Sequence, residues 1–124
     1  MQVDVHVLLT NNDSEPFIGI GIVWLLIGIE KHHSITRAAR EMKLSYPKAL
    51  RLIGNLEKGL GQPIVVRRKG GSEGGGAELT PFGSDFVRRF DRMQNKIRRF
   101  AAAAFEKDFA RSPYSSYKEA PRRR

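Results

Sequence analysis

Cysteine is absent from the 124-residue sequence, and long apolar runs are absent as well. Without thiols the chain forms no disulfide and offers no thiolate ligand to zinc or to an iron–sulfur cluster. The longest apolar run, Phe17 to Ile29, has 13 residues and includes three glycines, whereas a membrane-spanning helix needs roughly 20 residues. The N-terminus, MQVDVHV, has no basic residue ahead of an apolar run, so we expect no secretory signal and a cytoplasmic protein.

Acidic residues are scarce beside basic ones: 13 Asp and Glu stand against 22 Lys and Arg, a formal net charge of +9. The positive charge is concentrated in two segments. Residues 34–69 hold nine basic and two acidic residues, a net +7, and residues 88–124 hold twelve basic and four acidic residues, a net +8. Such segregation favours a polyanionic partner, either nucleic acid or an anionic membrane surface.

The hydrophobic periodicity predicts a mainly α fold with a small β component. Valine alternates with polar residues near the N-terminus, which predicts a strand with one buried face. Apolar residues three and four apart predict helices further along the chain. The expected elements are, in order, a strand at 2–9, a turn at 11–16, a short strand at 17–20, a helix from 21 to 32 or 33, helices at 35–43 and 46–60, strands at 63–69 and 77–79 around a glycine-rich loop, and a helix from 82 to about 109.

Two short helices joined by a tight turn and followed by a two-stranded hairpin are the parts of a winged helix-turn-helix. Ala38 and Ala39 allow the second short helix to cross the first closely, and Leu44 fills the turn. Ser45 caps the second helix, whose first residues and backbone N–H groups are expected to meet base edges and phosphates. A basic triplet stands at the base of the hairpin, where a wing lies against DNA. The candidate DNA-binding residues are Ser34, Thr36, Ser45, Tyr46, Pro47, Lys48, Arg51, Asn55, Arg67, Arg68 and Lys69.

The last helix carries one apolar stripe, because apolar residues recur every three or four positions along it. The helix is ~40 Å long at ~1.5 Å per residue, more than one small domain covers. An exposed row of phenylalanines is an aggregation hazard, so we expect a homodimer. We therefore expect residues 1–110 to form one DNA-binding and dimerisation domain and residues 111–124 a basic disordered tail. The stripe consists of Phe82, Phe86, Phe90, Met93, Ile97 and Phe100.

Two segments, HSITRAAREMKLSYPKALRLIGNLEKGLG (33–61) and IVVRRKGGSEGGGAELTPFG (64–83), resemble the DNA-binding domain of the ModE family of molybdate-responsive regulators, which is related to LysR-type winged helices. The resemblance covers about residues 3–105. It implies a dimer built from the N-terminal segment and the long last helix, with a recognition helix that starts at Ser45 and Tyr46. Two departures are visible: Leu50 stands where family members often carry Trp, and the chain ends before the family's molybdate-binding domains. We therefore expect no molybdate binding by this chain.

Other classes of function find little support in the residues. His32 and His33 are adjacent, so on a helix they point about 100° apart and share a metal poorly. The glycine-rich loop lacks the Gly-Lys-Ser/Thr sequence of a P-loop, and no nucleophile, base or carboxylate pair indicates an enzyme. We expect no metal, no cofactor and no catalysis, but sequence-specific binding of double-stranded DNA and transcriptional regulation. The alternative is a basic helical oligomerisation module that binds nucleic acid non-specifically or an anionic membrane surface.

Overall fold

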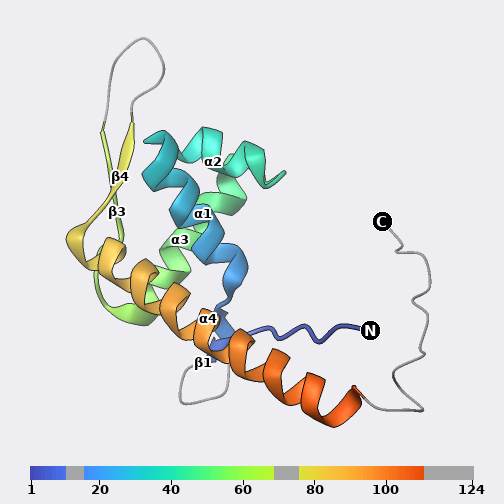
Figure 1. The fold of residues 1–124 in the computed structure, drawn as a ribbon. Helices are drawn as coiled ribbons and strands as arrows, with labels where there is room; N and C mark the ends of the chain where they lie inside the picture. Colours follow the sequence, from blue (N-terminus) through green and yellow to red (C-terminus); the bar gives the residue numbers. More distant parts are fainter. Residues whose placement is uncertain (11–15, 69–75, 111–124) are drawn as a thin grey trace. The chain divides into compact units, whose positions relative to one another are not determined.

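The computed structural model describes residues 1–10, 16–68 and 76–110, and its elements are shown in Figure 1. The mainly α architecture with a small β component is confirmed. Lys69, the 11–15 part of the expected turn and the expected tail lie outside the described residues. The elements are β1 (Leu9–Thr10), β2 (Pro16–Ile18), α1 (Ile20–His32), α2 (Ile35–Glu41), α3 (Tyr46–Leu60), β3 (Val65–Arg67), β4 (Ala77–Leu79) and α4 (Pro81–Phe109). Both strand pairs, β1–β2 and β3–β4, are antiparallel.

The chain forms two compact units, one of residues His6–Asp91 and one of Met1–Val5 with the chain from Arg92 onward. The core of the larger unit is centred on α1, which is apolar on nearly every side and therefore buries most of its length. Apolar side chains from α2, α3, the β3–β4 hairpin and the first part of α4 complete this core. Its fully buried members include Val23, Leu25, Leu26, Ile29, Ala49, Leu56 and Ile64.

The first two helices of the larger unit pack closely because small residues face each other. A Cβ added to Gly28 of α1 would lie 3.0 Å from the Cβ of Ala38 on α2. Ala38 and its neighbour Ala39 are both buried. Ala38 therefore allows a close approach to α1, the preceding helix, whereas the sequence predicts that the alanines face the helix that follows.

The expected strand at residues 2–9 is wrong over most of its length. Only Leu9 and Thr10 pair with β2, and the register between them is irregular. The alternation is present only in part: Val5 and Val7 are half-buried and Asp4 and His6 are exposed, but Val3 is exposed as well. A strand also needs a neighbour of matching length to accept its backbone hydrogen bonds, and β2 has only three residues.

Candidate nucleic-acid interface

Helix α2 begins at a serine cap and turns a basic face to solvent. The Ser34 Oγ accepts a hydrogen bond from the backbone N–H of Arg37 at 3.1 Å, which is the expected N-cap geometry. The side chain of Thr36, in the first turn, is exposed. Because the cap uses only the oxygen of Ser34, its hydroxyl hydrogen remains able to donate to an acceptor outside the protein.

The turn between α2 and α3 is short and well defined. Lys43 adopts a left-handed backbone conformation with φ of 58°, an uncommon region for a residue with a side chain. Leu44 is half-buried, and its backbone N–H donates to the carbonyl of Ala39 at 2.9 Å. These contacts set the angle at which α3 leaves the turn.

Helix α3 separates an apolar face from a polar face. The Ser45 Oγ accepts a hydrogen bond from the backbone N–H of Lys48 at 3.2 Å, and Pro47 occupies the first turn. On the polar face Lys48, Arg51 and Asn55 are exposed at positions i, i+3 and i+7, so they form one row along the helix. Tyr46 and Pro47 are exposed ahead of this row, and the opposite face is buried through Ala49, Ile53 and Leu56.

The β3–β4 hairpin is fixed to α3 by a carboxylate. The Oε2 of Glu57 accepts hydrogen bonds from the backbone N–H groups of Ile64 at 2.7 Å and Val65 at 3.3 Å. Thr80 closes the other side: its hydroxyl donates to the carbonyl of Pro63 at 2.7 Å and accepts from the N–H of Gly83 at 3.0 Å. The hairpin therefore stands in a fixed position beside the recognition helix that the sequence predicts.

The basic residues of the hairpin differ in their surroundings. Arg67 and Arg68 are both exposed at the end of β3. A guanidinium nitrogen of Arg68, Nη2, donates to the Oε2 of Glu78 at 2.7 Å. For Arg67 the structure records no hydrogen bond or ion pair with another described residue.

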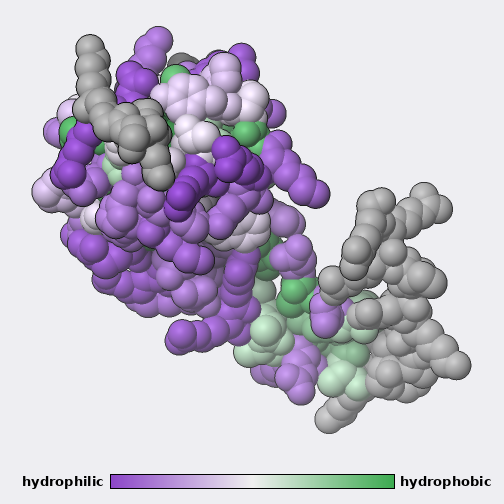
Figure 2. Space-filling model, turned by 90° about the horizontal axis from the view of Figure 1, so that it is seen from above, coloured by the Kyte–Doolittle hydropathy of each residue, from purple (hydrophilic) through white to green (hydrophobic). Residues whose placement is uncertain are grey.

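Both carboxylates of the basic segment 34–69 face structural partners. Glu41 lies 2.8 Å from the Nε2 of His32, which joins the ends of α1 and α2. Glu57 accepts from the backbone of β3. Both carboxylates thus have a partner within the unit, although Glu41 itself is exposed, and cations outnumber them on the outward-facing surface of α2 and α3. Figure 2 shows mostly hydrophilic side chains on the viewed face of this unit.

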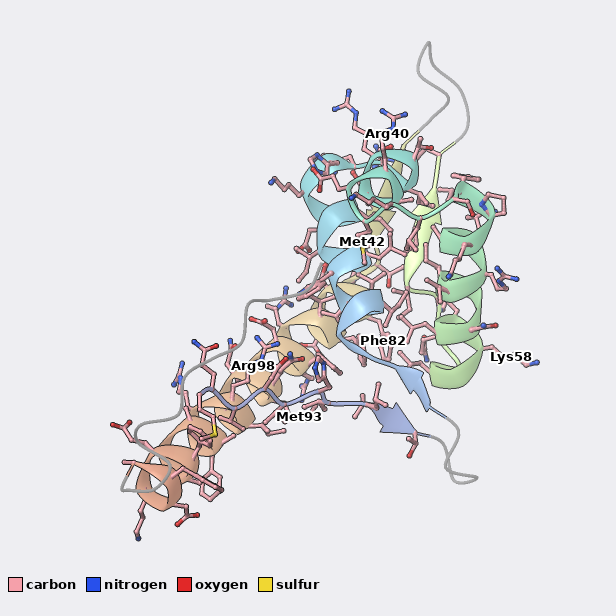
Figure 3. The ribbon with its side chains drawn as sticks, turned by 90° about the vertical axis from the view of Figure 1, so that its right-hand side faces the viewer. Arg40, Met42, Lys58, Phe82, Met93 and Arg98 are labelled. Atoms are coloured by element: carbon pink, nitrogen blue, oxygen red, sulfur yellow. The ribbon has the colours of Figure 1, made fainter. Side chains whose placement is uncertain are left out.

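Three exposed cations lie beside the predicted set and were absent from it. Arg37 and Arg40 are on the solvent face of α2, and Lys43 is in the turn. Figure 3 shows Arg40 projecting outward from α2, whereas Lys58 projects from the C-terminal end of α3. The exposure of Arg37 and Arg40 is predictable from the sequence, because in helical register both lie off the buried face formed by Ile35, Ala38 and Ala39.

Metal-ligand clusters and membrane-spanning helices are both absent from the described ranges 1–10, 16–68 and 76–110. There, no three His, Asp or Glu side chains come together in a way that could hold a metal ion. No helix in those ranges is both long enough and apolar enough to cross a membrane.

Comparison with known proteins identifies relatives in sequence. Residues 25–84 match the family described as "Bacterial regulatory helix-turn-helix protein, lysR family". The chain is similar to the molybdenum transport protein ModE of Azotobacter vinelandii, 39% identical over 70 residues, which are 56% of this chain and 26% of that protein. It is also similar to the molybdenum-pterin-binding protein MopA of Rhodobacter capsulatus, 34% identical over 82 residues, which are 66% of this chain and 31% of that protein. The match thus spans about a quarter to a third of each relative.

Solved structures share the fold. The chain is similar to CbnR_DBD in its complex with DNA, with a TM-score of 0.58 and 23% identity over 76% of this chain and 100% of that chain. It is also similar to BenM_DBD bound to catB site 1 DNA, with a TM-score of 0.55 and 22% identity. That match covers 75% of this chain and 96% of the BenM_DBD chain. At these identities the likeness concerns the fold, a winged helix-turn-helix followed by a long helix, as the sequence predicts.

Proposed function

We propose that the protein, whose residues 25–84 match the LysR-family helix-turn-helix model, binds double-stranded DNA with sequence specificity and thereby regulates transcription. The observation that carries this proposal is the exposed polar face of α3, with Lys48, Arg51 and Asn55 in one row behind a capped N-terminus. Arginine, lysine and asparagine are side chains that read base edges in the major groove. The matched family is one of regulators and not of enzymes.

In the proposed complex the N-terminal half of α3 enters the major groove. Tyr46, Lys48 and Arg51 contact base edges or the adjoining phosphates, and Asn55 lies further along the same face. Ser34, Thr36, Ser45 and Pro47 lie at or next to the starts of α2 and α3, where contacts to the DNA backbone fix the register of a bound protein. The sequence also assigns the basic residues of the wing, Arg67, Arg68 and Lys69, to this contact set.

The protein is proposed to act as a homodimer joined through the C-terminal half of α4. Phe100 is 77% exposed, and Phe105 and Phe109 stack with ring centroids 5.1 Å apart near the helix end. Apolar side chains also gather on this part of α4 in Figure 2. A second copy is the proposed cover for this surface. Two-fold symmetry then places the recognition helices on half-sites ~34 Å apart or a multiple of that distance.

Within residues 1–110 the unit of residues His6–Asp91 is proposed to bind DNA and the unit that contains Arg92–Phe109 to join the two copies. The basic residues among 111–124 add positive charge to the molecule. Binding to chromosomal DNA implies a cytoplasmic location. The named molybdenum proteins align with this chain over 26% and 31% of their lengths, and the proposal includes no molybdate site within these 124 residues.

Selection of bound duplexes from a random DNA pool tests the proposal. The chain is incubated with the pool at a stated salt concentration, since affinity for DNA depends steeply on salt. We expect an enriched motif with two-fold symmetry. A pool that stays random after repeated rounds, although the protein retains DNA, would show non-specific binding and would contradict the proposal. Anionic vesicles retained as strongly as DNA would favour the membrane alternative.

A further inference from the structure

The two adjacent wing arginines lie on opposite faces of the β3–β4 hairpin. Arg67 pairs with Ala77, and Val66 pairs with Glu78. Directly paired residues of an antiparallel ladder share one face, and successive residues alternate between faces. Ala77 is 2% exposed and belongs to the core, so the face that Arg67 shares is the inner one. Arg68 falls on the outer face, and Glu78 on that face accepts its hydrogen bond.

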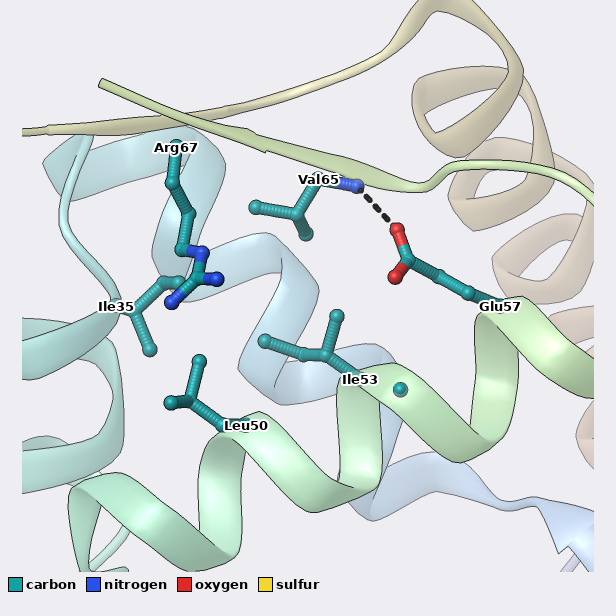
Figure 4. A pocket seen from close by; sticks show the side chains of 7 residues that line it. Ile35, Leu50, Ile53, Glu57, Val65 and Arg67 are labelled. Atoms are coloured by element: carbon teal, nitrogen blue, oxygen red, sulfur yellow. Dashed lines mark hydrogen bonds between the residues drawn. The ribbon is translucent and has the colours of Figure 1, made fainter. Parts of the chain in front are cut away.

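On the inner face, Arg67 extends from the wing toward α2 and α3. Figure 4 shows its guanidinium beside Ile35, the first residue of α2, and on the side of the pocket where Leu50 of α3 lies. The pocket has a volume of about 210 Å³, and Ile53, Gly54 and Glu57 form part of its lining. The guanidinium thus lies at the pocket between the β3–β4 hairpin and α3, and no described residue forms an ion pair with its positive charge.

Arg68 has a different arrangement on the outer face. Its guanidinium lies 2.7 Å from the carboxylate of Glu78. Val66, its neighbour on this face, is 52% exposed and in contact with solvent. The charge of Arg68 is therefore compensated within the hairpin, on the face turned away from α3.

The position of Arg67 relative to α3 is fixed by the backbone of the strand that carries it. Glu57 of α3 binds the N–H groups of Ile64 and Val65. The carbonyl of Ile64 accepts a hydrogen bond from the N–H of Thr80 at 2.8 Å. Three hydrogen bonds thus hold the start of β3, two residues before Arg67, and the guanidinium is presented to whatever α3 binds.

We propose that Arg67 binds a backbone phosphate at the edge of the groove that α3 enters, and that Arg68 makes no DNA contact. This inference rests on the proposed DNA binding and refines it, because the sequence alone assigns both arginines to the interface. Arginine suits the role, since its planar guanidinium can donate two hydrogen bonds to one phosphate. The wing would then touch DNA through its inner face.

The test compares Arg67→Gln with Arg68→Gln, two variants that lose the same charge. Affinity for the selected duplex is measured by fluorescence anisotropy between about 50 and 200 mM salt, where phosphate contacts dominate the salt dependence. For Arg67→Gln we expect a Kd raised roughly tenfold, as for loss of one charge-assisted hydrogen bond. The slope of log affinity against log salt should also become shallower by about 0.9 per protomer.

For Arg68→Gln, and for Arg68→Gln combined with Glu78→Gln, we expect a Kd within about twofold of the wild type and an unchanged slope, because exposed ion pairs contribute little. Arg67→Lys keeps the charge and should keep the slope, which separates a phosphate contact from a folding defect. A loss of affinity in Arg68→Gln that equals or exceeds the loss in Arg67→Gln would overturn the inference. Wild-type affinity in Arg67→Gln would overturn it as well. A wild-type chain that fails to bind any duplex would instead refute the proposed function.

Discussion

Replacing Glu57 with alanine removes the carboxylate that fixes the β3–β4 hairpin to α3. In the native fold this carboxylate accepts from Ile64 N–H at 2.7 Å and from Val65 N–H at 3.3 Å. Ile64 is fully buried, so after the substitution its N–H has no protein acceptor in place of Glu57. A buried donor left without an acceptor costs roughly 1–3 kcal/mol. We take about 2 kcal/mol for Glu57→Ala, because the longer second bond adds little.

The assay is thermal unfolding followed by circular dichroism. A loss of 1 kcal/mol lowers Tm by roughly 4–8 °C in a domain of 60–100 residues, so Glu57→Ala should lower Tm by about 8–16 °C. Glu57→Gln should lose less, since its amide oxygen, although uncharged, can still accept hydrogen bonds from both N–H groups. Glu78→Ala is the matched control: it removes a carboxylate from an exposed ion pair, worth roughly 0–1 kcal/mol. Equal Tm values for Glu57→Ala and Glu78→Ala would refute the anchoring role of Glu57.

Three further predictions concern packing, assembly and ligand. Gly83→Ala should destabilise the fold by roughly 1–3 kcal/mol in urea unfolding, because its Cβ would lie 2.6 Å from the carbonyl oxygen of Ile64. Gly54→Ala on α3 meets nothing within 4 Å and should stabilise by about 0.5–1 kcal/mol; a Gly83→Ala variant as stable as the wild type, or more stable, would contradict the packing at Gly83. Phe100→Glu should leave Tm of the larger unit unchanged and shift the mass in light scattering from dimer to monomer, and a wild type already monomeric at micromolar concentration would contradict the proposed dimer. Millimolar molybdate should leave Tm unchanged, since only a ligand that binds the native state raises it; a rise with molybdate that sulfate does not produce would refute this.

The helical part of the fold follows from local signals that the sequence carries openly. Ser34 and Ser45 stand where helices begin, and both hydroxyls cap the helix that follows, as the sequence predicts for Ser45. Ala49, Ile53 and Leu56 repeat at helical spacing, and all three are buried. Such signals act within one or two turns of a helix, so they are readable without knowledge of the tertiary structure.

Features that depend on a partner elsewhere in the chain were not predictable in the same way. The valine alternation at residues 2–9 indicates extended backbone, but it does not reveal that the neighbouring strand is only three residues long. The expected stripe on α4 includes Phe82, which is 42% exposed, and omits Val87, which is 5% exposed. Apolar spacing marks a helical face, while the elements that cover it decide which turns are buried.

The candidate site shows the same division. The row on α3 could be predicted from spacing alone, because its members share a face of one helix. The wing anchor at Glu57 depends on how β3 approaches α3, and no local pattern records that approach. Arg67, the last residue of β3, and Arg68, which follows it, have no distinguishing local pattern in the sequence, and only the pairing of β3 with β4 separates their faces.

The central claim is that the exposed face of α3 reads DNA sequence. Its most direct test is the ratio of wild-type affinities for the selected duplex and a scrambled duplex at one salt concentration, repeated with Arg51→Ala and with Lys58→Ala. Both are exposed cations of α3, but Lys58 lies in its last turn. We predict a wild-type ratio of roughly 10³ or more, and an unchanged ratio in Lys58→Ala. In Arg51→Ala we predict a ratio lowered roughly 5- to 150-fold, which corresponds to a loss of about 1–3 kcal/mol of base discrimination. A wild-type ratio near one, or equal ratios in all three proteins, would contradict the account.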